Sequence, residues 1–205
     1  MDTQFVIFSV IILVLSAAFH EYMHAWMADR LGDHTARDLG RLTINPIAHL
    51  DWFGSIFLPF LLIISQVPFV FGYAKPVPFN PHNLRDQRWG SAKVAAAGPL
   101  ANFLLALAFG LTLRFMPSID ARLGTFLAYI VIINLVLMFF NLVPIPPLDG
   151  SKILASFLPY HLQQKLFRLE PYGMMLVILF ILMGMRFVWQ GVNVLFFLIV
   201  GTWLF

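Results

Sequence analysis

The chain contains no cysteine and few charged residues, and both shortages restrict what it can be. Without cysteine it has no disulfide framework and no thiolate metal site, so any bound metal must be held by histidine and carboxylate groups. Only 11% of its 205 residues are charged, whereas 60% are hydrophobic and 22 are phenylalanine. This balance excludes a small soluble globule and predicts an integral membrane protein.

Apolar segments occupy most of the chain and predict an all-α membrane protein that forms one domain over residues 1–205. The segments cover residues 5–28, 53–72, 94–116, 123–143, 172–186 and 187–205. The first of them lacks the basic start and the cleavage site of a secretory signal, so we expect it to be retained. The last two are expected to be extra C-terminal membrane helices.

Basic residues are concentrated in three loops, at 29–51, 72–93 and 144–171, while the loop at 117–122 holds only Arg122. The net charge of +3 therefore suits orientation in a membrane better than binding to nucleic acid. By the positive-inside rule, the three basic loops belong on the cytoplasmic side.

The segment 53–72 is predicted to enter the membrane and return on the same side. A full crossing would place the first two basic loops on opposite sides, and Pro59 and Pro68 would interrupt a regular spanning helix. A single proline-kinked span, with a different pairing of the later helices, is the alternative. With the re-entrant segment, the chain after 123–143 returns to the cytoplasmic side.

The sequence His20-Glu21-Tyr22-Met23-His24 places ionisable side chains in a segment that otherwise matches one bilayer crossing. Such residues are costly inside a membrane unless they have partners, so a functional role is the default. Positions four apart share one face of a helix, so both imidazoles can face one ion. This is the H-E-x-x-H pattern of zinc sites, in which the glutamate takes a proton from a water activated by the metal.

Two histidines leave a zinc site incomplete, so a third protein ligand is expected from elsewhere in the chain. Among the carboxylates, Asp149 stands out because it follows the apolar run 123–143 and a stretch with three prolines that holds the chain extended. Two interpretations are open. Asp149 is either a metal ligand or a solvated cap for a helix at 151–157.

Three spaced motifs give the chain a resemblance to the site-2 protease family of intramembrane zinc metalloproteases. They are H-E-x-x-H on an early membrane helix, Gly98-Pro99-x-x-Asn102 at the start of another, and Asn141-x-x-Pro144-x-Pro146-x-x-Asp149-Gly150 after a third. The motifs cover the segments 5–28 and 94–150. The resemblance implies that these segments form a three-helix catalytic core.

The resemblance also implies an activity, namely hydrolysis of a peptide bond in or near the transmembrane segment of a substrate protein or peptide. It assigns one Zn²⁺ ion per chain to His20, His24 and Asp149, and the role of general base to Glu21. The run from Gly40 to Asp51 resembles the segment after the first motif in small bacterial members of the family, which implies a bacterial or archaeal cell membrane. By the positive-inside rule, the active site is expected toward the cytoplasm.

Substrate binding is implied for residues that match or follow the later motifs. In the family, the asparagine that matches Asn141 and the proline-rich strand after it help to hold the unwound substrate, and this role extends to Pro144 and Pro146. Asn102 is a weaker candidate, because a buried amide needs a partner, which either a group near the site or a developing oxyanion could supply. Packing against the zinc helix is the simpler role for the small residues around it.

The connection at 29–93 contains two further features. Gly40–Ile44 alternates enough to predict a short strand, which either pairs with an unwound substrate or has a structural role alone. His49 is either a partner of the metal site or a satisfied histidine at the membrane interface. The remaining length leaves no room for a PDZ-like or CBS-like domain within this chain.

A catalytically inactive metal-binding scaffold or chaperone of the membrane is the alternative function. It would use the same metal ligands, but it would have no need of Glu21 as a base. In either case we expect the lipid bilayer as the surroundings and no nucleic acid as a partner, and the oligomeric state stays open.

Overall fold

The computed structural model describes residues 3–51, 57, 75–116 and 118–204. Helices connected by turns make up these residues, with no β-strand among them. The prediction of an all-α protein is therefore confirmed for the described part of the chain.

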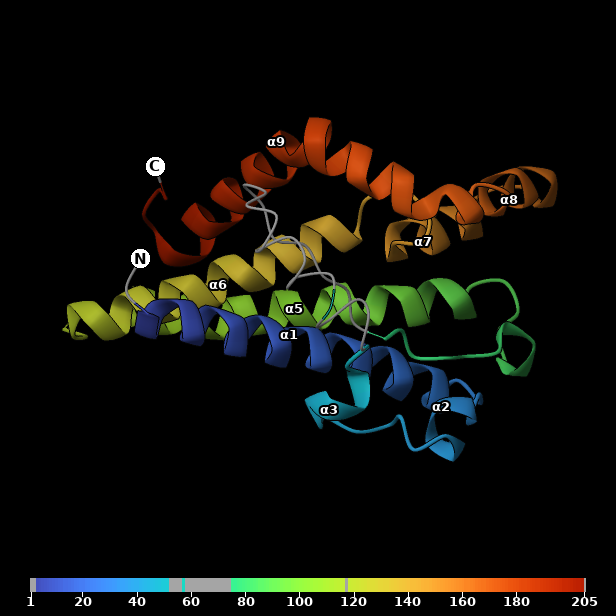
Figure 1. Ribbon diagram of the computed structural model, residues 1–205, viewed down its shortest axis with the longest axis horizontal. Helices are drawn as coiled ribbons and strands as arrows, with labels where there is room; N and C mark the ends of the chain where they lie inside the picture. The colour runs from blue at the N-terminus through green and yellow to red at the C-terminus, as the bar shows by residue number, and fades with distance from the viewer. Residues whose placement is uncertain (1–2, 52–56, 58–74, 117, 205) are drawn as a thin grey trace.

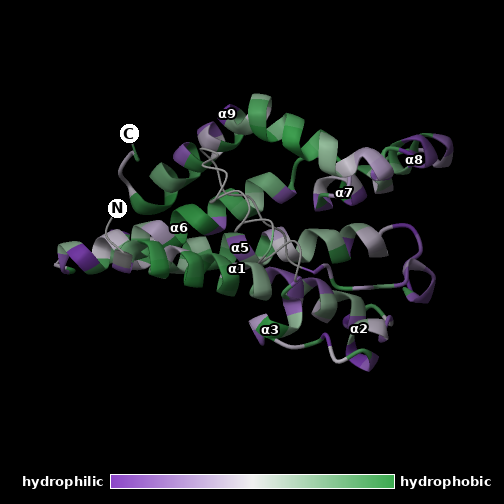
Figure 2. Ribbon diagram, in the orientation of Figure 1, coloured by the Kyte–Doolittle hydropathy of each residue, from purple (hydrophilic) through white to green (hydrophobic). Residues whose placement is uncertain are grey.

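Four of the described helices are long and apolar enough to cross a membrane. They are α1 (Thr3–Arg30), α5 (Gly90–Phe115), α6 (Ala121–Asn141) and α9 (Gly173–Val200). With a rise of about 1.5 Å per residue, even α6 reaches the roughly 30 Å of a bilayer's hydrocarbon core. Most of their residues are hydrophobic (Figure 2), as lipid contact requires.

Local sequence signals define the ends of these helices. The side chain of Asp120 accepts hydrogen bonds from the backbone N–H groups of Arg122 and Leu123, and so caps the start of α6. Gly201 adopts a left-handed conformation with φ of 94° and terminates α9.

The helix α5 lies at the centre of the arrangement and contacts α1, α6, α9 and the short helix α7 (Asp149–Phe157) (Figure 1). Its buried positions are mostly small residues, which let the neighbouring backbones approach closely. These positions include Ala92, Ala95, Ala97, Gly98, Ala101, Ala106 and Gly110. The main hydrophobic core fills the space between α5, α6 and α9 around Val131, Leu135 and Val192.

Two helix boundaries differ from the predictions. Gly98-Pro99 was expected to open a helix, but α5 begins at Gly90 and carries Pro99 in its interior. A proline there removes one backbone hydrogen bond, a loss that packing on several sides of α5 offsets. The apolar segments predicted at 172–186 and 187–205 form one helix, α9, which bends near its middle (Figure 1).

Most of the short elements lie toward the end of the long helices that is opposite the two chain termini, whereas the helix at 46–49 lies alongside α1 (Figure 1). The short elements are α2 (Thr35–Asp38), α3 (Pro46–His49), η2 (Pro81–Asn83), α7, α8 (Tyr160–Phe167) and η3 (Glu170–Tyr172). Most of them belong to the three basic loops, and the residues around α2, α8 and the connection before α5 are largely hydrophilic (Figure 2). All three basic loops therefore meet at the same end.

The strand predicted at Gly40–Ile44 is wrong. Gly40 has a positive φ of 67° and forms a turn, and the N–H of Arg41 donates back to the carbonyl of Ala36. Asn45 then caps α3 through its side chain. These local bonds use the backbone in a turn, so no strand forms there. The predicted re-entrant segment 53–72 lies outside the described residues, apart from Phe57.

Candidate metal centre

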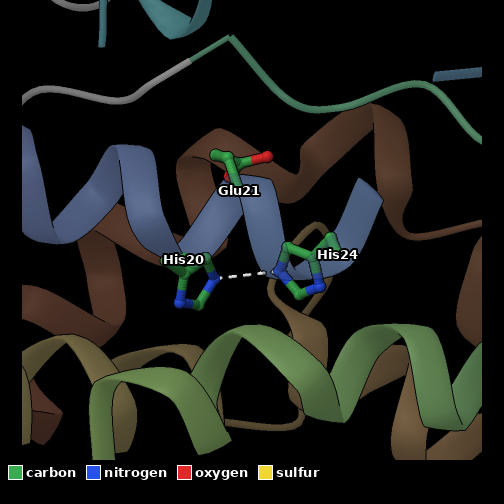
Figure 3. Close-up of side chains that lie close together, drawn as sticks. All are labelled: His20, Glu21 and His24. Atoms are coloured by element: carbon green, nitrogen blue, oxygen red, sulfur yellow. Dashed lines mark hydrogen bonds between the residues drawn. The ribbon is translucent and has the colours of Figure 1, made fainter. Parts of the chain in front are cut away.

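The two histidines of the H-E-x-x-H motif lie one turn apart on α1 and face the same point. Their Nε2 atoms are 2.9 Å apart, and both side chains are buried (Figure 3). Asp149, the first residue of α7, places its Oδ2 atom 3.1 Å from the Nε2 atom of each histidine. The structure thus brings together the three predicted ligands, which come from positions far apart in the sequence.

Asp149 does not cap the helix that it begins. The N-cap of α7 is Leu148, which makes no side-chain capping bond, and the Asp149 carboxylate is buried against the imidazoles. Lys152 Nζ lies 3.7 Å from the other carboxylate oxygen of Asp149.

The start of α7 lies close to the end of α6, and this close approach depends on Gly150, the residue after Asp149. A Cβ atom on Gly150 would overlap the backbone carbonyls of Leu142 and Val143. The absence of a side chain there allows α7 to start directly against the end of α6. This contact is what brings the Asp149 carboxylate to the histidines on α1.

The second nitrogen of each imidazole identifies the tautomer. The Nδ1 atom of His24 lies 2.7 Å from the carbonyl oxygen of Val94, and that of His20 lies 2.6 Å from Asn102 Oδ1. Both partners are acceptors, so each Nδ1 carries the proton and each neutral ring presents a lone pair at Nε2.

This donor set fits a cation. Two imidazole lone pairs and one carboxylate oxygen converge within 3.1 Å of one another, and no proton on a neutral ring separates them. Three electron pairs at such distances repel each other unless a positive charge lies between them. Zinc bonds of about 2.0–2.1 Å place neighbouring tetrahedral ligands roughly 3.3 Å apart, close to the separations found. His20, His24 and Asp149 therefore suit a zinc ion that keeps one open position.

Glu21 lies beside the ligands without joining them in this arrangement. One of its carboxylate oxygens is within 4.8 Å of imidazole nitrogens of both histidines. Its side chain points toward the extended chain on the other side of α1 (Figure 3), and Oε2 accepts the N–H of Val77 at 3.0 Å. A carboxylate next to the metal position and held by a backbone donor is suited to accept a proton from water.

The segment that contains Val77 is one that the sequence interpretation missed. Residues 75–80 run in extended form over Glu21, tied at one end by Lys75 N–H to the His49 carbonyl and at the other by Asn80 N–H to Asp33. The alternating Pro76 and Pro78 predict an extended backbone, and that signal could have identified the segment. Val77 is the one residue between the two prolines, and its N–H reaches the carboxylate.

The remaining predicted residues lie around the centre in different ways. Asn141 donates to the Leu137 carbonyl of its own helix and is half-buried. Pro144 is exposed and Pro146 buried, and both belong to the connection that leads from α6 to Asp149. His49 is buried with Nε2 2.7 Å from the carbonyl oxygen of Thr43, so it does not belong to the metal cluster.

Asn102 lies behind His20. It was a candidate for a hydrogen bond near the site or to a developing oxyanion, and its side chain is fully buried. Its Oδ1 faces His20, while its Nδ2 donates to Asn134 Oδ1 at 2.9 Å and to the Ser16 carbonyl at 3.4 Å. Both amide hydrogens and one lone pair of Oδ1 are thus used inside the protein, and a role toward an oxyanion stays a prediction.

Comparison with known proteins agrees with this geometry. Residues 8–119 and 116–185 match Peptidase family M50. The "Putative zinc metalloprotease YwhC" of Bacillus subtilis is 36% identical over 194 residues, which cover 90% of this chain and 85% of that protein. No solved structure matches the chain.

Two more distant relatives carry the same designation. Rip2 of Mycolicibacterium smegmatis is 31% identical over 175 residues, which cover 82% of this chain and 64% of Rip2. MJ0611 of Methanocaldococcus jannaschii is 32% identical over 160 residues, which cover 72% of each protein. With the matched residues extending over most of its length and four apolar helices long enough to cross a bilayer, the chain belongs to peptidase family M50, the site-2 protease family, and is a multi-pass membrane protein.

Proposed function

We propose that the protein is an intramembrane zinc metalloprotease that hydrolyses a peptide bond in or near a transmembrane segment of its substrate. One observation carries the proposal. The lone pairs of His20 and His24 and the carboxylate of Asp149 converge on one point, with the carboxylate of Glu21 beside them. One zinc ion per chain fits this set, and family membership supports zinc as the metal.

The metal and the protein have separate tasks in this reaction. A zinc ion held by His20, His24 and Asp149 would supply Lewis acidity toward a scissile carbonyl and toward water. Glu21 takes the proton from the attacking water and later gives it to the leaving amine. The Val77 N–H, 3.0 Å from Oε2, orients the carboxylate while it holds or releases that proton.

The position of the site along α1 supports cleavage close to the membrane surface. The motif lies in the last third of a helix that spans Thr3–Arg30, near the end where the basic loops meet. A substrate helix must unwind before its carbonyl can reach such a site, because a helix satisfies its backbone groups internally. We assign the holding of the unwound segment to Asn141, Pro144 and Pro146, on the connection that leads to Asp149.

The basic end of the molecule faces the cytoplasm in this proposal, by the positive-inside rule. The relatives come from bacteria and an archaeon, which supports a bacterial or archaeal cell membrane as the location. The partner is then a membrane protein or peptide whose transmembrane segment reaches the cytoplasmic side of the bilayer.

The test is cleavage of tagged single-span substrates by the purified protein in detergent, with wild type compared to Glu21→Gln and the zinc content of both determined. We expect the variant to lose cleavage and to keep its zinc, because glutamine cannot accept the proton but fits the same space. Equal cleavage by both proteins would contradict the proposed base. Zinc in both with no cleavage by either across the panel would favour the inactive metal-binding scaffold.

A further inference from the structure

One face of α5 backs both histidines of the metal centre. Val94, Gly98 and Asn102 are spaced four residues apart and so lie along one side of the helix. The Val94 carbonyl accepts from His24, and the Asn102 side chain accepts from His20. Between them, a Cβ atom on Gly98 would overlap the Nε2 atoms of both rings. The α5 helix therefore gives each ring an acceptor and leaves space where the two rings meet.

The two acceptors differ in how they are held. The Val94 carbonyl belongs to the helix backbone, so its direction is fixed by α5 itself. The Asn102 oxygen belongs to a side chain that could rotate by 180° and present its NH₂ group to His20. Its orientation must therefore be fixed by other contacts.

Those contacts form a buried chain of hydrogen bonds across three membrane helices. Asn102 Nδ2 donates to Asn134 Oδ1 on α6 and to the Ser16 carbonyl on α1. Asn134 Nδ2 donates in turn to Ser16 Oγ at 3.0 Å and to the Ile130 carbonyl at 3.0 Å. Neither asparagine side chain is exposed at all. Because both NH₂ groups have acceptors, the Asn102 oxygen is left for the Nδ1 proton of His20.

We propose that Asn102, with its amide orientation fixed by Asn134 and Ser16, is a positioning residue that sets the tautomer and direction of His20 for metal binding. The inference rests on the proposed function, in that it takes zinc as the ligand of the centre. With Asn102 in place, the His20 proton stays on Nδ1 and the Nε2 lone pair points at the metal. Without it, a buried Nδ1–H loses its acceptor, and the ring is free to turn or to move its proton to Nε2.

Zinc affinity of the full-length protein tests this role, because it needs no substrate. Wild type, Asn102→Leu, Asn102→Asp and Val192→Ala are titrated against a chelator in detergent, and the absorption spectrum of each is recorded with Co²⁺ in place of zinc. Leucine removes the acceptor at nearly constant volume, whereas aspartate keeps it. Val192→Ala is the control for packing, since it removes buried atoms from the hydrophobic core and takes no part in the buried chain of hydrogen bonds. The melting temperature of each metal-free protein measures how much the substitution disturbs the packing of the helices.

We expect Asn102→Leu to weaken zinc binding by about 10- to 100-fold, the range seen when a partner behind a ligand is removed, and to alter the Co²⁺ spectrum. Asn102→Asp is expected to stay within about threefold of wild type, and Val192→Ala to lower the melting temperature while its zinc affinity stays within about threefold of wild type. Asn102→Ala, which only removes atoms, gives the same comparison if the leucine variant does not fold.

Zinc affinity of Asn102→Leu within about threefold of wild type would overturn the inference and leave the proposed function standing. An equal loss in Val192→Ala and Asn102→Leu would also overturn it, because the effect would then belong to packing in general. A wild-type protein that binds no zinc would overturn the inference together with the proposed function.

Discussion

At the scale of single residues, the candidate metal centre depends on a side chain that is absent, at Gly98, as much as on the side chains that are present. His20 and His24 follow from the sequence pattern alone, since positions four apart on a helix face one ion. Gly98 does not, because a glycine in an alanine-rich helix indicates close packing and nothing about what it packs against. Only the folded structure shows that the imidazole nitrogens occupy the space of its missing side chain.

We expect Gly98→Ala to abolish stoichiometric zinc binding, because the added Cβ atom would displace both imidazole rings. Zinc content after purification and dialysis is the measurement. Gly124→Ala on α6 is the matched control, since a Cβ atom there has its nearest neighbour at 3.5 Å, an ordinary contact. Normal zinc content in Gly98→Ala would show that α1 and α5 are farther apart than the structure places them.

The general base provides a second test at this scale. Val77→Pro removes the N–H that donates to Glu21, whereas Val77→Ala keeps it and removes only the buried side chain. A hydrogen bond to a charged group contributes about 1.5–3 kcal/mol, so we expect kcat of Val77→Pro to fall by roughly 10- to 100-fold. Zinc content is expected to be unchanged in both variants. Similar kcat values for the two variants would assign the effect to packing and not to the donor.

At the scale of elements, the loop after α1 is tied to the connection before α5 by one buried carboxylate. Asp33 accepts from the Thr35 hydroxyl at 2.5 Å, from Asn83 Nδ2 at 2.9 Å and from the Asn80 N–H at 2.6 Å. It thereby fixes one end of the extended segment that crosses Glu21. In the sequence Asp33 is one of several aspartates in a polar loop, and nothing local marks it as buried.

This contact predicts a pH dependence of stability. Burial alone raises the pKa of Asp33, but the hydrogen bonds from Thr35, Asn83 and Asn80 outweigh it and lower that pKa below 3.8. A lowered folded-state pKa means that the stabilisation is present above the pKa of the unfolded chain and is lost as pH falls through the folded pKa. The melting temperature of wild type should therefore exceed that of Asp33→Asn near neutral pH, and the difference should shrink below about pH 4.

Asp38→Asn is the control for this measurement, because Asp38 is an exposed aspartate in the same loop. Its melting temperature is expected to follow that of wild type across the same pH range. A constant difference between wild type and Asp33→Asn from pH 7 to pH 3 would contradict the assigned role of the carboxylate.

Element boundaries show what sequence patterns resolve well and what they do not. Hydrophobic length located the spans near α1, α5 and α6, because a bilayer crossing needs a long apolar run. It divided α9 in two at 186–187, because the polar Arg186 interrupts the apolar run although it does not interrupt the helix. The alternation of side chains predicted a strand at Gly40–Ile44, because such a pattern cannot reveal that Gly40 turns the backbone.

At the scale of the whole molecule, the described basic elements lie at the end of the long helices opposite both termini (Figure 1). The absence of cysteine makes their orientation directly measurable, since any introduced cysteine is the sole thiol. We expect Asp38→Cys and Gln164→Cys, both exposed, to react in intact cells only with a membrane-permeant maleimide. Ser118→Cys, in the exposed turn between α5 and α6, is expected to react with an impermeant reagent as well.

The opposite labelling pattern would invert the proposed topology. Labelling of Asp38→Cys and Gln164→Cys from different sides would contradict the structure itself, because α2 and α8 lie at one end of the bundle. The cysteine-free wild-type protein is the control, because any labelling of it measures the non-specific reaction of the reagent.

The sequence predicts the ligands of the candidate site but not the residues that hold these ligands in place. His20, Glu21, His24 and Asp149 belong to motifs whose spacing reflects their chemistry. The residues that hold the ligands in place, such as Val77 and Asn134, act through tertiary contacts between segments tens of residues apart, which no local pattern encodes. The positions of Asn141, Pro144 and Pro146 relative to a bound substrate stay predictions.

The separation of the ligands in the sequence has a consequence for biosynthesis. His20 and Asp149 are 129 positions apart, so synthesis delivers the second half of the centre long after α1 has entered the bilayer. A chain that ends before Asp149 lacks the third ligand and so has no complete metal site. Zinc at 100 times its Kd would then add about 2.7 kcal/mol to the stability of the assembled state alone.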